Sequence, residues 1–266
     1  TYAYKISKEF SIGLAPTFNY ATLQLAPNPL SSPSPILGFP ESNKATALGI
    51  GGQLGIFYNS GKGIKLGASY KTAQTFESFE FKNTYLDESK APGVKFKMNY
   101  PSILSAGIGY SMYKFDVAVD YRFVNYEKTA GFEEKGWTNT YSVAGFGWKN
   151  MSIVSAGIQY KGINKFPVRL GYTYSSNPIS RKLAFFSTPA TAIIKNAFQL
   201  GCGYEFNRHF TLNAMYHHGS SNSSTNGPLL SPLMKTSDNP YGAIPDSKVS
   251  YKMNTDLVML GINYTF

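Results

Sequence analysis

The chain has little charge, a single cysteine and no long hydrophobic run. Charged residues make up 15% of its 266 residues, whereas soluble domains usually carry about 25%. Because Cys202 is the only cysteine, an intrachain disulfide is excluded and no cysteine framework for a metal exists. No stretch approaches the roughly 18–20 consecutive apolar residues that a transmembrane helix needs. These absences argue against an ordinary soluble domain, a disulfide-rich domain and a helical membrane protein.

The sequence also lacks the patterns of an enzyme, a metalloprotein or a nucleic-acid-binding protein. No nucleophile, base and acid occur at a spacing that recommends a catalytic set. His217 and His218 are adjacent, so on a strand they point to opposite faces and cannot share a metal. The net charge is +10, but the basic residues are scattered singly and form no stripe. We therefore expect no catalysis, no cofactor, no metal and no nucleic-acid partner.

Aromatic residues and glycine are plentiful. The chain contains 20 tyrosines, 19 phenylalanines and 25 glycines. Tyrosine suits a membrane–water interface because its body is apolar and its tip is polar. Together with the low charge, this composition fits a β-barrel whose outer face meets lipid and whose inner face is polar.

The dominant pattern is an alternation of apolar and polar residues with a period of two. In 94–110 the even-numbered positions are mostly apolar and the odd-numbered ones mostly polar or glycine. This run exceeds an ordinary strand of about 5–6 residues, and a tilted membrane strand needs about 9–11. Similar alternation recurs in 12–20, 48–58, 64–70, 115–123, 168–174, 194–206 and 258–266.

The connections between these segments alternate between short and long. Short turns are expected at 59–63, 111–114, 162–165 and 207–209, and long polar links at 26–44, 82–93, 126–148, 176–191 and 219–247. Such strict order is typical of an up-and-down barrel with one periplasmic and one external rim. We therefore predict an all-β fold, an antiparallel up-and-down transmembrane β-barrel of the bacterial outer membrane, with about ten complete strands.

Both ends of the chain carry information. The first residues lack the charged start and apolar stretch of a signal peptide. Residues 2–6 form a strand stub that should pair with the strand near 10–25, which implies at least one further strand upstream. The last segment alternates through Tyr264 to Phe266, and a terminal aromatic on an alternating strand resembles the signal read by the outer-membrane assembly machinery.

Blocks throughout the chain resemble the FadL/TodX family of outer-membrane transporters of long-chain fatty acids and aromatic hydrocarbons. Their order and spacing carry the resemblance more than any single block does. The similar blocks are Tyr4–Gly13, Met98–Ser102, Ala106–Tyr110, Asp116–Tyr121, Gly147–Ser152, Gly157–Tyr160, Leu170–Ile179, Met215–Gly219 and Gly261–Phe266.

The resemblance implies a 14-stranded barrel plugged by an N-terminal hatch. Residues 1–266 would then be a single barrel domain that lacks the hatch and about three strands. It also implies that ligand is caught between external loops, enters a pocket inside the barrel and leaves sideways into the bilayer. An apolar pocket competes well with water, since each buried CH₂ contributes about 0.8 kcal/mol. The expected partners are long-chain fatty acids or other hydrophobic small molecules, with lipopolysaccharide around the barrel.

One departure leaves the substrate open. The family's carboxylate-binding bases align with Pro27 and Ala144 here, which would favour uncharged hydrophobic compounds, although Lys44, Lys135 or Lys149 could substitute. Fatty acid and aromatic hydrocarbon thus both remain possible substrates. Two alternatives to transport of hydrophobic compounds also stay open: a structural or adhesive barrel, and a water-filled diffusion porin.

Candidate site residues follow from the expected faces of the strands. Lumen bases could bind an anionic head group or pair with Asp116, Asp120 and Glu205; these bases are Arg122, Arg169, Lys71, Lys95 and Lys195. Phe185 and Phe186, with Ile193 and Ile194, could form an apolar capture patch or pack as loop core, and so could Ile36, Leu37 and Phe39. We expect Tyr110, Tyr121, Leu200, Cys202 and Tyr264 to face lipid, and Lys95, Asp120, Arg122, Arg169 and Glu205 to face the lumen.

Overall fold

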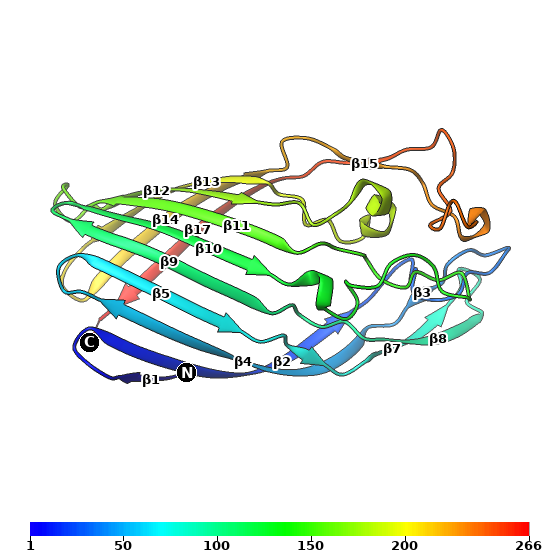
Figure 1. The fold of residues 1–266 in the computed structure, drawn as a ribbon, viewed down its shortest axis with the longest axis horizontal. Coiled ribbons are helices and arrows are strands. Elements are labelled where there is room, and N and C mark those ends of the chain that lie inside the picture. The colour runs from blue at the N-terminus through cyan, green and yellow to red at the C-terminus, as the bar shows by residue number, and fades with distance from the viewer. Residues whose placement is uncertain (266) are drawn as a thin grey trace.

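A computed structural model describes residues 1–265, and its main element is one curved antiparallel sheet (Figure 1). Each strand on the main path pairs with the next one along that path, from β1 at one edge to β17 at the other. Ten of these strands have eight to fifteen residues, which confirms the predicted number. The strands are β1 (Tyr2–Lys5), β2 (Phe10–Leu23), β4 (Ala45–Asn59), β5 (Ile64–Lys71), β9 (Ile103–Met112), β10 (Phe115–Val124), β11 (Met151–Tyr160), β12 (Val168–Ser175), β13 (Asn196–Glu205), β14 (Phe210–Ser220) and β17 (Asn254–Tyr264).

The two ends of the sheet differ, as the alternation of turn lengths predicts. Short turns gather at one end, together with both termini, and long connections gather at the other (Figure 1). None of the described helices is long and apolar enough to cross a membrane. The long connections carry β3 (Glu41–Ser42), β7 (Phe79–Thr84), β8 (Lys90–Phe96), β15 (Thr225–Gly227), β16 (Val249–Tyr251) and the 3₁₀ helices η1 (Tyr126–Lys128), η2 (Arg181–Ser187) and η3 (Pro232–Met234).

The N-terminal strand stub, residues 2–5, pairs with β2 as predicted. Tyr2 pairs with Leu14 and Lys5 with Ser11, so β1 lies antiparallel to β2 across a short turn. In that turn the Ser7 hydroxyl accepts hydrogen bonds from the backbone N–H groups of Glu9 and Phe10.

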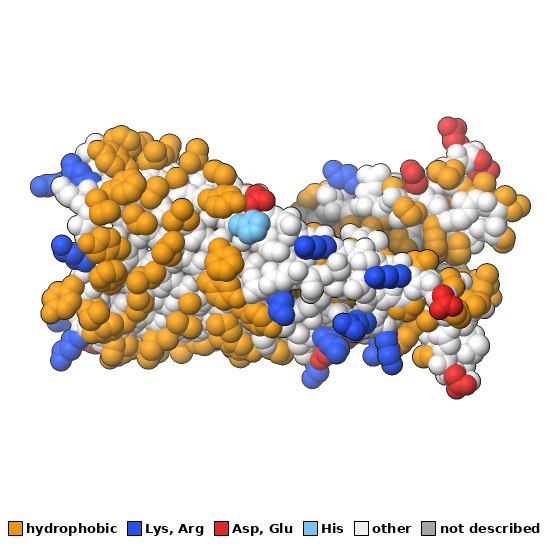
Figure 2. All heavy atoms as spheres, turned by 90° about the horizontal axis from the view of Figure 1, so that it is seen from above, with side chains coloured by type: hydrophobic (Ala, Val, Ile, Leu, Met, Phe, Trp, Pro, Cys, Tyr) orange, Lys and Arg blue, Asp and Glu red, His pale blue; other side chains and the backbone are white. Residues whose placement is uncertain are grey.

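Alternation assigns one face of every strand to the outside. Directly paired residues share a face, so Leu170, Leu200 and Tyr216 form part of one outward row across β12, β13 and β14. The outer side chains form an apolar band next to the short-turn end, and charged side chains gather beyond it (Figure 2). The residues expected to face lipid, Tyr110, Tyr121, Leu200, Cys202 and Tyr264, all fall on this outer face.

The prediction for Lys95 is wrong, because 94–110 is not one strand. The segment divides into β8 and β9, separated by residues 97–102. Pro101 lies in that break, and proline cannot donate a ladder hydrogen bond. β8 belongs to a separate three-stranded sheet in the long connections. There Lys95 forms an exposed ion pair with Glu80 and does not face the lumen.

An irregular segment follows β5 and then rejoins β4. β6 (Thr75–Phe76) pairs with Gly49 and Ile50 of β4, while residues 72–74 bulge away from the regular register. The Gln74 side chain is buried against the wall and accepts hydrogen bonds from Thr17 and Asn19. A Cβ at Gly51 would lie 2.2 Å from Gln74 Nε2, so any side chain at this position would displace the buried Gln74 amide.

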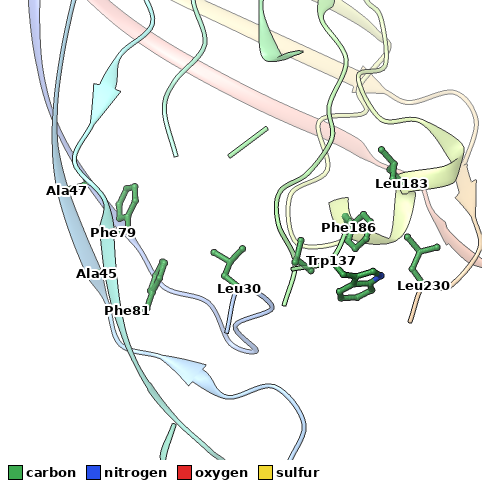
Figure 3. Close-up of a cluster of buried hydrophobic side chains, with 10 residues drawn as sticks. Leu30, Ala45, Ala47, Phe79, Phe81, Trp137, Leu183, Phe186 and Leu230 are labelled. Carbon is green, nitrogen blue, oxygen red and sulfur yellow. The ribbon is translucent and has the colours of Figure 1, made fainter. Parts of the chain in front are cut away.

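The long connections enclose a hydrophobic core of their own. Phe79 and Phe81 lie on one side of Leu30, and Trp137 and Phe186 lie on its other side (Figure 3). All five residues belong to one buried cluster. The Trp137 indole donates a hydrogen bond to the Tyr241 carbonyl at 2.9 Å, which joins two connections about a hundred residues apart. The external loops are therefore a packed cap and not independent loose links.

Candidate functional site on the inner wall

Glycine lines much of the inner face and makes room for longer polar side chains. Gly171 faces Gln199 across the strand pair, and a Cβ at Gly171 would come within 2.8 Å of the Gln199 amide oxygen. Gly201 pairs with Arg169, so the arginine side chain has no opposing side chain on β13. The wall therefore lets a few polar groups lie along it while keeping space between them.

Arg169 is held in place by neutral amides. Its Nε donates to the Gln159 side-chain oxygen at 2.6 Å, and its Nη1 donates to the Asn213 side-chain oxygen at 3.1 Å. Gln159 in turn donates to Asp116 at 3.2 Å, and Asp116 forms an ion pair with Lys161 at 2.9 Å. Within residues 1–265, Asp116 therefore pairs with Lys161, and no carboxylate lies within ion-pair distance of Arg169. Arg169 thus keeps a positive charge that an anionic group could meet.

A cavity of about 480 Å³ lies beside Arg169. Amide side chains of Gln199, Asn213 and Asn263 contribute polar surface, while Met215 and Met259 contribute apolar surface. Met215 pairs directly with Met259 across β14 and β17, and with Gly201 on β13. The cavity thus combines one guanidinium group with a flexible apolar wall, an arrangement suited to an amphiphile.

The other predicted lumen groups lie apart from this cavity. Asp120 lines a second cavity of about 570 Å³ between β1 and β10, whose wall includes several glycines and serines as well as bulky apolar residues. Arg122 pairs with Ser105 and Ile153 on the inner face, and its side chain has no hydrogen-bond or ion-pair partner among the described residues. Glu205 follows Gly201 and Gly203 on the inner face of β13 at the short-turn end.

Two lysines make contacts that the sequence did not reveal. Lys71 ends β5, and its Nζ lies 5.0 Å from the centre of the Tyr100 ring. Lys195 precedes β13, and its Nζ lies 5.8 Å from the Tyr174 ring, which belongs to the outer face of β12. The predicted lumen position of Lys195 is therefore wrong. A lysine just outside a strand is free to turn towards an aromatic ring.

The phenylalanines of η2 belong to the loop core. Phe186 is buried and its ring centre lies 5.0 Å from that of Trp137, while Phe185 lies 6.2 Å from Trp137. Ile193 is buried in a neighbouring cluster around Trp148. In this conformation both phenylalanines contact protein, which matches the loop-packing alternative. Ile36, in contrast, is 92% exposed at the tip of its loop.

A charged cavity of about 380 Å³ lies among the loops. It brings together Lys135, Lys149 and Lys182 with Glu127 and Glu133. Two of these lysines are the candidates to replace the family's carboxylate-binding bases. Lys44 lies elsewhere, in a polar hollow near Glu77 and Glu80.

The pKa shifts of titratable groups in the loops result from burial and from local hydrogen bonds. Burial raises the pKa of Tyr251 from its ordinary value near 10 to about 12, and its hydroxyl donates to the Ala184 carbonyl at 3.1 Å. Burial also raises the pKa of Tyr126. A hydrogen bond from Lys95 lowers the pKa of the exposed Glu80. All three groups keep their ordinary charge near neutral pH. No cluster of three or more His, Cys, Asp or Glu side chains suited to a metal occurs within residues 1–265.

Sequence reasoning missed Met215, Met259 and the amides around Arg169. A signal exists for Met259, because 257–260 is apolar on both faces of β17. The amides Gln159, Gln199, Asn213 and Asn263 carry no such signal, since they come from four strands that only the register brings together. The predicted assembly residue Tyr264 lies on the outer face at the end of β17, and Phe266 falls outside the described residues.

Three solved structures share this fold. A Pseudomonas aeruginosa FadL homologue matches with a TM-score of 0.64 and 13% identity, covering 98% of this chain and 66% of the homologue. The Ralstonia pickettii toluene transporter TbuX matches with a TM-score of 0.61 and 15% identity, covering 99% of this chain and 66% of TbuX. The Pseudomonas putida toluene transporter TodX matches with a TM-score of 0.62 and 14% identity, covering 99% of this chain and 67% of TodX. The chain thus spans about two thirds of their length.

At the level of sequence, no curated protein matches significantly. A family model described as "Outer membrane protein transport protein (OMPP1/FadL/TodX)" matches residues 1–266, the whole chain. The antiparallel sheet and its apolar outer band agree with that match. The chain therefore belongs to the OMPP1/FadL/TodX family of outer membrane transport proteins.

Proposed function

We propose that the full-length protein carries amphiphilic hydrophobic molecules, with long-chain fatty acids as the best candidates, across the outer membrane. The observation that carries this proposal is Arg169 beside the methionine-lined cavity. The guanidinium group would meet a carboxylate, and Met215 with Met259 would contact the acyl chain. A charge-assisted hydrogen bond contributes about 1.5–3 kcal/mol, which favours an acid over a hydrocarbon at this site.

The rest of the transport path is part of the same proposal. We expect a hatch and about three further strands to complete a barrel around the inner wall, because the chain spans about two thirds of its solved relatives. Ligand would be captured at the external loops, bind inside and leave sideways through the wall. The loop cavity with Lys135 and Lys149 is the best candidate for a first contact with an anionic head group.

Two relatives have toluene as their named substrate, and this favours an uncharged aromatic hydrocarbon as the second candidate. The aligned positions Pro27 and Ala144 point the same way, since neither carries a base. The two candidates differ in whether a charge on the inner wall matters for binding.

The test compares an acid with its alkane. We would measure binding of a long-chain fatty acid and of the alkane of equal length to the full-length protein, to Arg169→Gln and to Arg122→Gln. Losing the charged hydrogen bond at Arg169 should weaken acid binding by about ten- to a hundredfold and leave alkane binding nearly unchanged. Arg122→Gln is the matched control, since it removes a lumen arginine outside the cavity.

Three results would contradict the proposal. Equal losses for acid and alkane would mean that Arg169 braces the wall. Tight toluene binding without acid binding would favour the second candidate. Free ion conductance through the reconstituted protein, without binding of any hydrophobic ligand, would indicate a diffusion porin.

A further inference from the structure

The outer face carries an apolar groove that the transport path does not use. The groove has a volume of about 750 Å³ and extends across β10 to β14. Its wall consists of outward side chains in two adjacent rows of the sheet. One row contains Val117, Ile158, Leu170, Leu200 and Tyr216, and the other contains Val119, Ala156, Tyr172, Phe198 and His218.

The groove exists because a small residue lies between large ones. Ala156 pairs with Val119 on one side and with Tyr172 on the other. The rings of Tyr172 and Phe198 contact each other at 5.0 Å between centres and form the next part of the wall. A methyl group between these bulky side chains leaves a hollow in the outer surface.

A polar cluster marks one end of the groove. His218 Nδ1 lies 2.8 Å from the Asp256 carboxylate, and the Tyr216 hydroxyl donates to the same oxygen at 2.5 Å. His218 pairs with Asp256 in the row that contains Ala156, so both face outwards. Ionisable groups on a lipid-facing wall are costly and usually have a function. Because Nδ1 contacts Asp256, the other ring nitrogen, Nε2, is left for a ligand.

Lys195 adds a positive group near this end. Its Nζ lies over the outward Tyr174 ring, one row beyond the groove. Asn196 pairs with Tyr174 in that row and accepts a hydrogen bond from the Tyr172 hydroxyl of the groove wall. His218 lies two residues from the loop end of β14, and long loops are external in outer-membrane barrels. The polar end of the groove therefore lies at the level of the outer leaflet.

We propose that this groove binds one phosphorylated glycolipid of the outer leaflet, of the lipid A type. An acyl chain lies over Ala156 between Val119 and Tyr172. In the bound state the Lys195 side chain turns from Tyr174 towards His218, so that one phosphate accepts hydrogen bonds from Lys195 Nζ and from Nε2 of a His218 imidazolium. The Nδ1 of that imidazolium donates to Asp256, which also accepts from the Tyr216 hydroxyl. The occupant is a lipid because the groove opens to the bilayer, and it is anionic because the bases at its end complement a phosphate.

The test uses purified lipid A, dephosphorylated lipid A and phosphatidylglycerol as probes. Native mass spectrometry of the full-length protein in detergent would give the affinity for each. Wild type should bind lipid A at least tenfold more tightly than the other two probes. Ala156→Phe fills the groove and should weaken both forms of lipid A by about tenfold. His218→Ala and Lys195→Gln should weaken only the phosphorylated form, by about tenfold each.

Matched controls separate this site from general effects. Ala106→Phe enlarges an outward alanine on β9, where Ala106 pairs with Tyr121, and Lys114→Gln removes a lysine from the short-turn rim. Both should bind lipid A like wild type, and far-ultraviolet circular dichroism would confirm folding of every variant. Equal lipid A binding by all variants would overturn the proposal, as would equal affinity of wild type for phosphatidylglycerol.

Discussion

At the residue scale, small side chains decide what the inner wall can hold. Gly171 and Gly201 leave room for Gln199 and Arg169, and Gly51 leaves room for Gln74. The absent Cβ matters here for its volume, since none of these three glycines adopts a positive φ. The abundance of glycine is therefore a steric feature of the inner surface.

Replacing Gly51 by alanine should destabilise the protein. The new methyl group would displace the buried Gln74 amide and weaken its hydrogen bonds with Thr17 and Asn19. Overpacking of this kind costs about 1–3 kcal/mol. The free energy of unfolding, from denaturant titration in detergent, is the measurement. Gly261→Ala is the control, because no atom lies within 4 Å of its added Cβ, and equal stabilities of the two variants would refute the prediction.

At the element scale, period-two alternation predicts the face of a residue wherever a strand stays in the wall. It succeeds for β10, β12 and β13, whose outward and inward residues follow the sequence pattern. It fails for 94–110, because the pattern is the same in a loop hairpin and in a wall strand. Only the partner strands distinguish the two, and they are remote in sequence.

Cys202 gives a direct check on the orientation of β13. It pairs with Val168 and Ala214 on the outer face, so in a bilayer its thiol should meet lipid. A charged, membrane-impermeant thiol reagent should therefore label Cys202 at least tenfold more slowly than a cysteine at Ser223 in a Cys202→Ser background. Ser223 is exposed in an external loop. Equally fast labelling of both would show that β13 is placed in the wrong register.

At the scale of the whole molecule, the external loops act as one packed cap. Trp137 joins the loop before β11 to the loop before β17 through Tyr241, and it contacts Phe185 and Phe186 of a third loop. Cohesion of the cap therefore depends on contacts between segments that are far apart in the chain.

Removing the Trp137 side chain should loosen this cap and leave the wall intact. Large-to-small changes of buried aromatics cost about 3–5 kcal/mol, and here the loss falls on loop packing. Trypsin should then cleave at the exposed Lys235 at least tenfold faster in Trp137→Ala than in wild type. Tyr141→Ala alters a half-exposed residue of the same loop, and trypsin should cleave this variant at the same rate as wild type. An unchanged cleavage rate in Trp137→Ala would mean that the loops are held by other contacts.

The sequence by itself determined the fold class, the number of wall strands, the side of the long loops and the face of most strand residues. These properties are local, because a two-residue period and a turn length are each written in a short stretch of chain. Arg169 was predicted on the inner face for the same reason. The blocks that resemble the family are also short stretches, so their order along the chain indicates the family without any knowledge of strand pairing.

Only the tertiary structure decided how the site is composed. Arg169 donates hydrogen bonds to Gln159 and Asn213 and shares a cavity with Met215 and Met259, because the strands from β11 to β17 pair in one register. No local pattern encodes which residues lie opposite one another. The same holds for Lys195, which turned to the outer Tyr174, and for Phe186, which became loop core. A local pattern sets the direction of a side chain, whereas its partners depend on the register between strands and on the packing of remote loops.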